Sequence, residues 1–231
     1  MIEPAGNAGR VNADREIADL LAHLARDVTH ELRGPVQSVV VNLEVLRRRA
    51  AKGEIADVEN RAAIVEEEVR RLHSLADAFV GLVREPAAAP AIMSAAAMLA
   101  VAGPLVHVIA KARHVAIDRR DPPPDTLVRV RPEPAALAIV RLVLALCENA
   151  GERATLVIEG DTGSDTFTVS FELRPAGDAD GDSVTAMVSE SVAAALPAAN
   201  AWLLDAGGTA TLDAVSKNVP ARVRVTLHRA T

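Results

Sequence analysis

Two long stretches of helical periodicity constrain the fold of this chain more than any other feature. The first runs from about Asp14 to Ala51, and the second runs from Ile55 to Val83. In both, apolar residues recur every three or four positions, which places them on one face of an α-helix. They are Ile17, Leu21, Leu24, Val28, Leu32, Val36, Val39, Leu43 and Leu46 in the first stretch, and Ile55, Val58, Ala62, Val65, Val69, Leu72, Ala76, Phe79 and Val83 in the second. Because Gly53 can supply a left-handed cap between them, the pattern predicts an antiparallel helical hairpin.

A single hairpin of this kind leaves much of each apolar stripe in contact with water. Two hairpins that pair can bury both stripes, so the pattern predicts a homodimer built around a four-helix bundle. The second stripe alternates steps of three and four throughout, which is the spacing of a coiled coil. We expect residues 1–13 to be a flexible lead and residues 14–85 to be the dimerisation hairpin.

One histidine of the first helix lies off the apolar stripe. At about 100° per residue, His30 points roughly 200° away from Val28 and Leu32, toward solvent. Pro35 has no N–H for the carbonyl of Glu31, so we expect a bend one turn after the histidine. Neutral imidazole is a good nucleophile toward phosphorus, and an adjacent carboxylate can hold its other nitrogen or accept its proton. The stretch therefore predicts that His30 and Glu31 are catalytic.

The six residues that begin at this histidine resemble the phosphoacceptor box of two-component histidine kinases. They read His30-Glu31-Leu32-Arg33-Gly34-Pro35. The resemblance implies phosphoryl exchange with an aspartate of a response-regulator receiver domain, and partner contacts through Asp27, Arg33 and Gly34. The family usually has Thr or Asn at the position of Gly34, where the side chain orients the water that dephosphorylates the regulator. Because glycine cannot do this, the resemblance argues against phosphatase activity.

Composition and charge exclude several other classes of protein. The formal net charge of −6 argues against broad contact with nucleic-acid phosphates. The single cysteine, Cys147, lies in an apolar run and is expected to be buried rather than redox-active or metal-bound. No charged-then-apolar secretory signal opens the sequence, so we expect a cytoplasmic protein. The remaining histidines are interpreted as surface or hydrogen-bonded polar groups, namely His23, His73, His107, His114 and His228.

A stretch without Asp, Glu, Lys or Arg, residues 86–110, has the length of a membrane span. It is rich in Ala rather than Leu and is interrupted by Ser94, Pro104 and His107. We therefore interpret it as a helix packed inside a folded domain and expect no contact with a membrane.

The helical pattern stops at residues 86–90, which read Pro-Ala-Ala-Ala-Pro and are the best candidate for a domain boundary. Beyond it, we predict helices over 91–112, 134–150 and 184–206, and strands over 114–119, 127–130, 154–159, 166–173, 208–215 and 221–228. Strict alternation of apolar and polar residues in two of these strands indicates a sheet with one face in water. Residues 91–231 are therefore predicted to form an α+β sandwich domain.

The end of the helix predicted over 134–150 is similar to the asparagine box of the kinase ATP-binding domain. In that family two asparagines face the nucleotide, and the second coordinates magnesium. Here the first position is Ala145 and the second is Asn149, which we keep as a vestigial cofactor-binding candidate. The basic residue usual three positions later is Glu152, whose charge would repel phosphate.

The glycine-rich loops of the family, which free backbone N–H groups for phosphate, also have no counterpart. The corresponding region, residues 174–183, contains no Asp-x-Gly-x-Gly. Its alternating carboxylates Asp178, Asp180 and Asp182 lack the later Glu of a calcium loop, so we interpret them as a solvated acidic loop and predict no metal site. The resemblance implies a degenerate ATP-binding-like domain without a cofactor, neither ATP nor magnesium.

The leading hypothesis is a dimeric histidine phosphotransferase that exchanges phosphoryl groups with receiver domains and does not autophosphorylate with ATP. One alternative is a true sensor histidine kinase core with an unusual ATP lid. Another is a non-catalytic dimeric pseudokinase scaffold that sequesters a regulator or a kinase.

Overall fold

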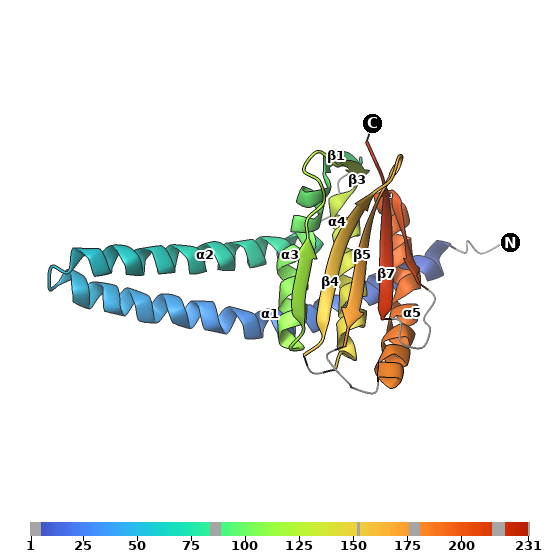
Figure 1. The fold of residues 1–231 in the computed structure, drawn as a ribbon. Coiled ribbons are helices and arrows are strands. Elements are labelled where there is room, and N and C mark those ends of the chain that lie inside the picture. The colour runs from blue at the N-terminus through green and yellow to red at the C-terminus, as the bar shows by residue number, and fades with distance from the viewer. Residues whose placement is uncertain (1–5, 84–88, 152, 176–180, 214–219, 231) are drawn as a thin grey trace.

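The computed structural model describes residues 6–83, 89–151, 153–175, 181–213 and 220–230. The first two helices, α1 (Gly6–Ala50) and α2 (Ile55–Val83), form a hairpin that projects from the rest of the molecule (Figure 1). Gly53 adopts φ +73° in the turn, a conformation in which glycine carries no steric cost. The first helix begins at Gly6, earlier than the sequence predicted, and continues through Pro35 without interruption.

The second part of the chain is an α/β sandwich. Its elements are β1 (Ala91–Ser94), α3 (Ala95–Ala112), β2 (Ala116–Arg120), β3 (Leu127–Val130), α4 (Pro132–Glu148), β4 (Thr155–Thr162), β5 (Thr166–Arg174), α5 (Gly181–Ala206), β6 (Gly208–Leu212) and β7 (Ala221–His228). Five strands form one sheet in the order β2-β4-β5-β7-β6, in which β2 and β4 are parallel and the other neighbours antiparallel. The predicted fold, a helical hairpin followed by an α+β sandwich, is confirmed.

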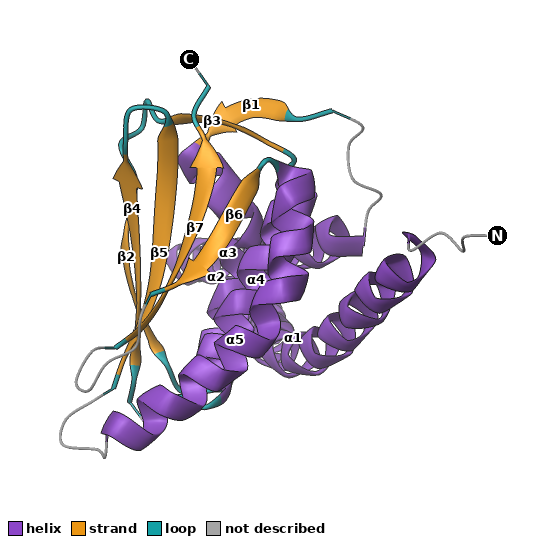
Figure 2. Cartoon of the chain, turned by 90° about the vertical axis from the view of Figure 1, so that its right-hand side faces the viewer, coloured by secondary structure: helices purple, strands orange, loops and turns teal. Residues whose placement is uncertain are grey.

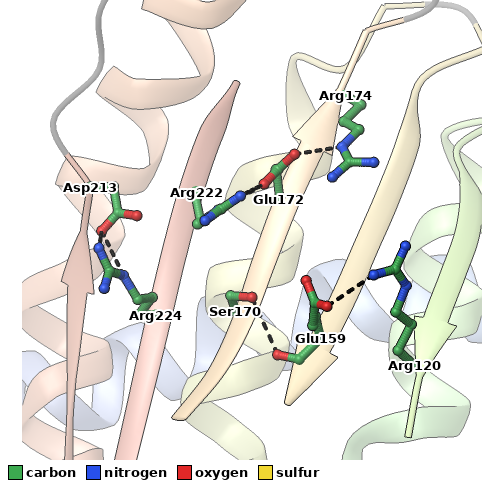
Figure 3. Close-up of polar contacts among 8 residues, drawn as sticks. All are labelled: Arg120, Glu159, Ser170, Glu172, Arg174, Asp213, Arg222 and Arg224. Atoms are coloured by element: carbon green, nitrogen blue, oxygen red, sulfur yellow. Dashed lines mark hydrogen bonds and ion pairs between the residues drawn. The ribbon is translucent and has the colours of Figure 1, made fainter. Parts of the chain in front are cut away.

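Helices α3, α4 and α5 cover one face of the sheet, and no helix of the described residues covers the other face (Figure 2). The strand pleat sends alternate side chains to the helices, where Phe167, Phe171 and Leu227 are almost fully buried. The opposite face carries charged pairs between strands (Figure 3). The prediction of one wet face is therefore correct.

The most buried charge on the wet face is Glu172, which is 4% exposed. It lies directly opposite Arg222 on β7 and forms ion pairs with Arg222 and Arg174 (Figure 3). Burial by itself raises the pKa of Glu172, but the hydrogen bonds and charges of the two guanidinium groups outweigh it, so the pKa is lowered. The carboxylate therefore holds β5 and β7 together in its charged form.

The sequence was wrong about residues 91–94, which were assigned to the start of a helix. They form β1, which pairs antiparallel with β3 in the register Ala91↔Val130. The helix begins only after Ser94, whose hydroxyl oxygen accepts a hydrogen bond from the N–H of Ala97 at 3.1 Å. Such an N-cap was a usable sequence signal, whereas pairing with a strand more than thirty residues later was not.

Of the helices in the described ranges, α3 is the one long and apolar enough to span a membrane, with a mean hydropathy of 1.7 over 18 residues. Half of that window is buried inside the molecule. Its side chains Met98, Leu105 and Ile109 are fully buried, and the helix contacts α1, α2 and α4. This burial supports the interpretation of α3 as a core helix.

The predicted apolar stripes of the hairpin are buried only in part. Leu24 and Val28 are buried as predicted, but Val36 and Leu43 are 49% and 44% exposed. On α2 the buried residues are Leu75, Ala78 and Leu82, none of which belongs to the predicted stripe. The difference arises because the end of α2 packs on α3 as well as on α1, which no periodicity within the hairpin could show.

Candidate functional site

Along its length α1 presents three faces. Leu20, Leu24 and Val28 pack into the hydrophobic core, and Val36, Val40 and Leu43 form an exposed aliphatic face. His30 is exposed on a third face, roughly 120° from the centre of each of the others at 100° per residue. The exposure expected for His30 is observed, and its catalytic role stays a prediction.

Glu31 faces away from His30, into the space between α1, α2 and α3. Its Oε1 accepts a hydrogen bond from Nζ of Lys111 at 2.7 Å and another from the guanidinium of Arg71. The Glu31 side chain is only 11% exposed. Consecutive residues of a helix do not face each other, and no hydrogen bond joins His30 to Glu31 in the part of the chain that the structure describes. The expected contact between carboxylate and imidazole is therefore absent from this geometry.

Asp27 lies one turn before Glu31 on the same side of α1. Its Oδ2 accepts a hydrogen bond from Nη1 of Arg113 at 2.7 Å, and both side chains are less than 20% exposed. Arg33 and Gly34, the other predicted partner contacts, are exposed, and a Cβ on Gly34 would meet no atom within 4 Å. The surface beside His30 that a partner could reach therefore includes Arg33 and Gly34 rather than the carboxylate of Asp27.

Of the three cations that meet these two carboxylates, Arg71 belongs to α2, whereas Lys111 lies in the last turn of α3 and Arg113 is its C-cap. That turn ends in a Schellman motif, in which the N–H groups of His114 and Val115 donate to the carbonyls of Lys111 and Ala110. His114 occupies the left-handed position, with φ +57°, that glycine usually takes. The motif stops the helix directly beside α1, so that its final side chains reach the hairpin.

A cavity of about 480 Å³ lies between these elements. Its lining includes Arg26 and His30 from α1, and Lys111 and His114 from the end of α3. A second cavity of about 390 Å³, between α2 and α3, shares Glu31 and is also lined by His107. The carboxylates Asp27 and Glu31 line the same cavity. His30 therefore stands at the edge of an open depression that carries both cations and carboxylates and to which both parts of the chain contribute.

No motif in the sequence singled out Lys111, and the sequence predicted His107 and His114 to be surface or hydrogen-bonded polar groups. His107 and Lys111 are spaced i, i+4 and share one face of α3, and His114 follows two residues after the end of that helix. That spacing was visible in the sequence, but its proximity to His30 depends on contacts between residues about eighty positions apart, such as Lys111 with Glu31. Only the tertiary structure brings them together.

Asn149, the vestigial nucleotide candidate, lies at the C-cap of α4. Its Nδ2 donates a hydrogen bond to Oγ of Ser191 on α5 at 2.7 Å, and Ala145 one turn earlier is fully buried. Glu152, Asp178 and Asp180 lie outside the described residues, as does most of the predicted boundary at 86–90. Among the residues that are described, no group of three or more His, Cys, Asp or Glu side chains could hold a metal ion.

Solved structures of three histidine kinases are similar to this chain. A kinase from Burkholderia phymatum has 15% identity and a TM-score of 0.44, over 95% of this chain and 99% of its own. ThkA in complex with the response regulator TrrA has 13% identity and a TM-score of 0.46, over 99% of this chain and 68% of its own. AdeS from Acinetobacter baumannii has 13% identity and a TM-score of 0.37, over 87% of this chain and 98% of its own.

No protein-family model matches the chain, and no curated protein matches it either. The identities and TM-scores of the solved structures are too low to assign a function.

Proposed function

We propose that this chain is a homodimeric histidine phosphotransferase of a two-component phosphorelay, which exchanges a phosphoryl group between His30 and an aspartate of a response-regulator receiver domain. The observation that carries the proposal is the exposed His30 at the edge of an open depression formed by α1 and the C-terminal end of α3. A rigid helix fixes the backbone of the nucleophile, and the open depression beside it leaves the imidazole accessible to a partner domain.

The transfer needs little from the protein beyond presentation of the imidazole. The unprotonated ring nitrogen of His30 attacks phosphorus, an N–P bond forms, and the P–O bond to the aspartyl carboxyl breaks. The aspartate leaves as a carboxylate with the bonding electron pair, and the proton on the other ring nitrogen passes to solvent. Magnesium for this step belongs to the receiver domain and requires no ligand from this chain.

Two features of α4 support a loss of ATP-dependent autophosphorylation. Asn149 is hydrogen-bonded to Ser191, and Ala145 is buried where the family has the first of its two asparagines. The sequence also lacks the Asp-x-Gly-x-Gly whose backbone N–H groups would hold phosphates. Phosphoryl transfer from ATP depends on positioning and neutralising the γ-phosphate, so we propose that neither ATP nor magnesium is a cofactor.

The aliphatic faces of the hairpin support a homodimer. Val36, Val40 and Leu43 on α1 are exposed at spacings of four and three. Val69, Val80 and Val83 on α2 are also exposed, within about 60° of one another on that helix. A second hairpin packed on these faces would remove both from water and leave His30 outside the contact.

The decisive experiment is a phosphotransfer assay with receiver domains charged by labelled acetyl phosphate. We expect label on the wild-type chain and on His73→Gln, a control at an exposed histidine of α2, but none on His30→Gln. A parallel reaction with labelled ATP and magnesium is expected to leave the chain unlabelled. Labelling by ATP would instead identify a histidine kinase, and binding without transfer would identify a non-catalytic scaffold.

A further inference from the structure

The Glu31 cluster, which consists of Glu31, Arg71 and Lys111, differs from most other ion pairs of the molecule in its position. Its carboxylate is 11% exposed and receives cations from two different helices, while the pair Arg48–Glu44 lies within α1 in water. Screening by water makes an exposed pair weak, and the depth of Glu31 reduces that screening. The cluster joins the hairpin to the α/β domain at the residue next to His30.

A second interdomain pair reinforces this arrangement. Asp27 binds Arg113 one turn before Glu31 binds Lys111, so two points on one side of α1 hold the last turn of α3. In the sequence His30 lies between Asp27 and Glu31, and its side chain is exposed on the neighbouring face of α1. Because the same turn carries His114 into the cavity that His30 lines, the ion pairs determine where the C-terminal end of α3 stands relative to the imidazole.

We propose that Lys111 is a positioning residue for phosphoryl transfer, and that Glu31 is its anchor rather than the proton acceptor of His30. The inference rests on the proposed function for its activity readout. Through Glu31, Lys111 fixes the end of α3 beside the imidazole, so that the α/β domain forms one wall of the site that receives an acidic, phosphorylated receiver domain. A Lys ammonium has three donors, and the bond to Glu31 uses one of them.

The opposing interpretation is that Glu31 removes the proton of His30. The geometry speaks against it, because residues i and i+1 of a helix do not face each other and Oε1 of Glu31 already accepts from two cations. The two interpretations predict different rates of His30 labelling by a small phosphodonor. Such a donor needs the imidazole but makes no contact with the end of α3.

The test compares Lys111→Met, Glu31→Gln, their double variant and the conservative Lys111→Arg in the 231-residue chain. Lys52→Met is the matched control, since Lys52 is an exposed lysine in the hairpin turn. Three quantities are measured for each: the rate of transfer from the receiver that reacts fastest with the wild type, labelling of His30 by phosphoramidate, and hydrogen exchange of the segment 107–115.

We expect Lys111→Met and Glu31→Gln each to slow receiver transfer about tenfold, with the double variant no slower than either. Lys111→Arg should retain most of the rate, and phosphoramidate labelling should match that of Lys52→Met throughout. Exchange of residues 107–115 should accelerate in the two single variants.

Two results would overturn the inference. One is a Lys111→Met variant indistinguishable from Lys52→Met in both transfer and exchange. The other is a loss of phosphoramidate labelling in Glu31→Gln alone, which would make Glu31 the proton acceptor. If no receiver transfers to the wild type, the proposed function fails, and the exchange measurement still decides whether Lys111 and Glu31 hold α3 in place.

Discussion

His30 and Glu31 are adjacent in the chain but belong to different surroundings. His30 is exposed, whereas Glu31 is directed between helices and paired with Lys111 and Arg71. A rotation of about 100° between successive helical residues explains this division. At the residue scale, a sequence motif therefore identifies candidate side chains, whereas the role of each one depends on which neighbouring helix or solvent it faces.

Cys147 should be chemically inert in the folded protein. Its side chain is 1% exposed, and burial raises the pKa of its thiol to about 12, so little thiolate forms near neutral pH. We expect a disulfide reagent such as DTNB at pH 8 to modify it no faster than the protein unfolds, and at once in denaturant. Rapid labelling of the native protein, absent from Cys147→Ser, would contradict this expectation.

Glu172 should contribute stability that depends on pH. Its pKa is lowered in the fold, so its contribution is present above the ordinary pKa of a glutamate and is lost as the pH falls through the lowered value. Glu172→Gln is expected to lower the free energy of unfolding by about 1–2 kcal/mol at pH 7.

Urea titrations across the acid range check this prediction, because the wild type and Glu172→Gln should converge in acid. Glu159→Gln is the matched control on the same face, since its pair with Arg120 at 3.0 Å is largely exposed (Figure 3). We expect that control to cost less than about 1 kcal/mol. A constant difference between wild type and Glu172→Gln down to pH 2 would be incompatible with this role.

At the scale of elements, α3 is at once a core helix and one wall of the candidate site. Its apolar side chains are buried between the sheet and the other helices, and His107 and Lys111 are exposed on its opposite side. The same helix therefore connects the packing of the α/β domain to the surroundings of His30.

Glycines within elements give a test of local packing. Gly81 lies inside α2, and an added Cβ would meet nothing within 4 Å, so Gly81→Ala should stabilise the protein by about 0.5–1 kcal/mol. Gly208 in β6 lies against β7, where a Cβ would stand 2.6 Å from the carbonyl oxygen of Thr226. Gly208→Ala should therefore destabilise by more than about 1 kcal/mol.

Thermal and urea unfolding of the two glycine variants test whether Gly81→Ala raises and Gly208→Ala lowers the free energy of unfolding. Destabilisation by Gly81→Ala would mean that the open side of α2 is occupied, for example by a second hairpin. A neutral Gly208→Ala would mean that β6 can move away from β7.

At the scale of the whole molecule, the hairpin leaves an aliphatic face that one chain cannot cover. Val40 on this face is 61% exposed, and a charge at the centre of an apolar contact is costly to bury. We predict that Val40→Glu raises the dissociation constant of the homodimer at least about a hundredfold. Sedimentation velocity at micromolar concentration should show a monomer.

The matched control is Val41→Glu, which has similar exposure but lies roughly 100° around α1, on the side of His30. It should remain dimeric. Equal dissociation of both variants, or a wild type that is itself monomeric, would count against the proposed dimer face.

The sequence alone was sufficient for the features that depend on local periodicity. Repeats of 3.6 residues predict the two helices of the hairpin and the exposure of His30. Repeats of 2 residues predict the alternating strands β5 and β7. The burial of Cys147 follows in the same way from its apolar neighbours.

Only the tertiary structure decided what each face of those elements touches. Three features depend on residues far apart in the chain. Strand β1 pairs with β3, Leu75 is buried in place of its predicted neighbours, and Glu31 accepts a hydrogen bond from Lys111. Local periodicity cannot predict such contacts. It shows which residues share a face of a helix, but not whether that face contacts water, a second helix or another domain.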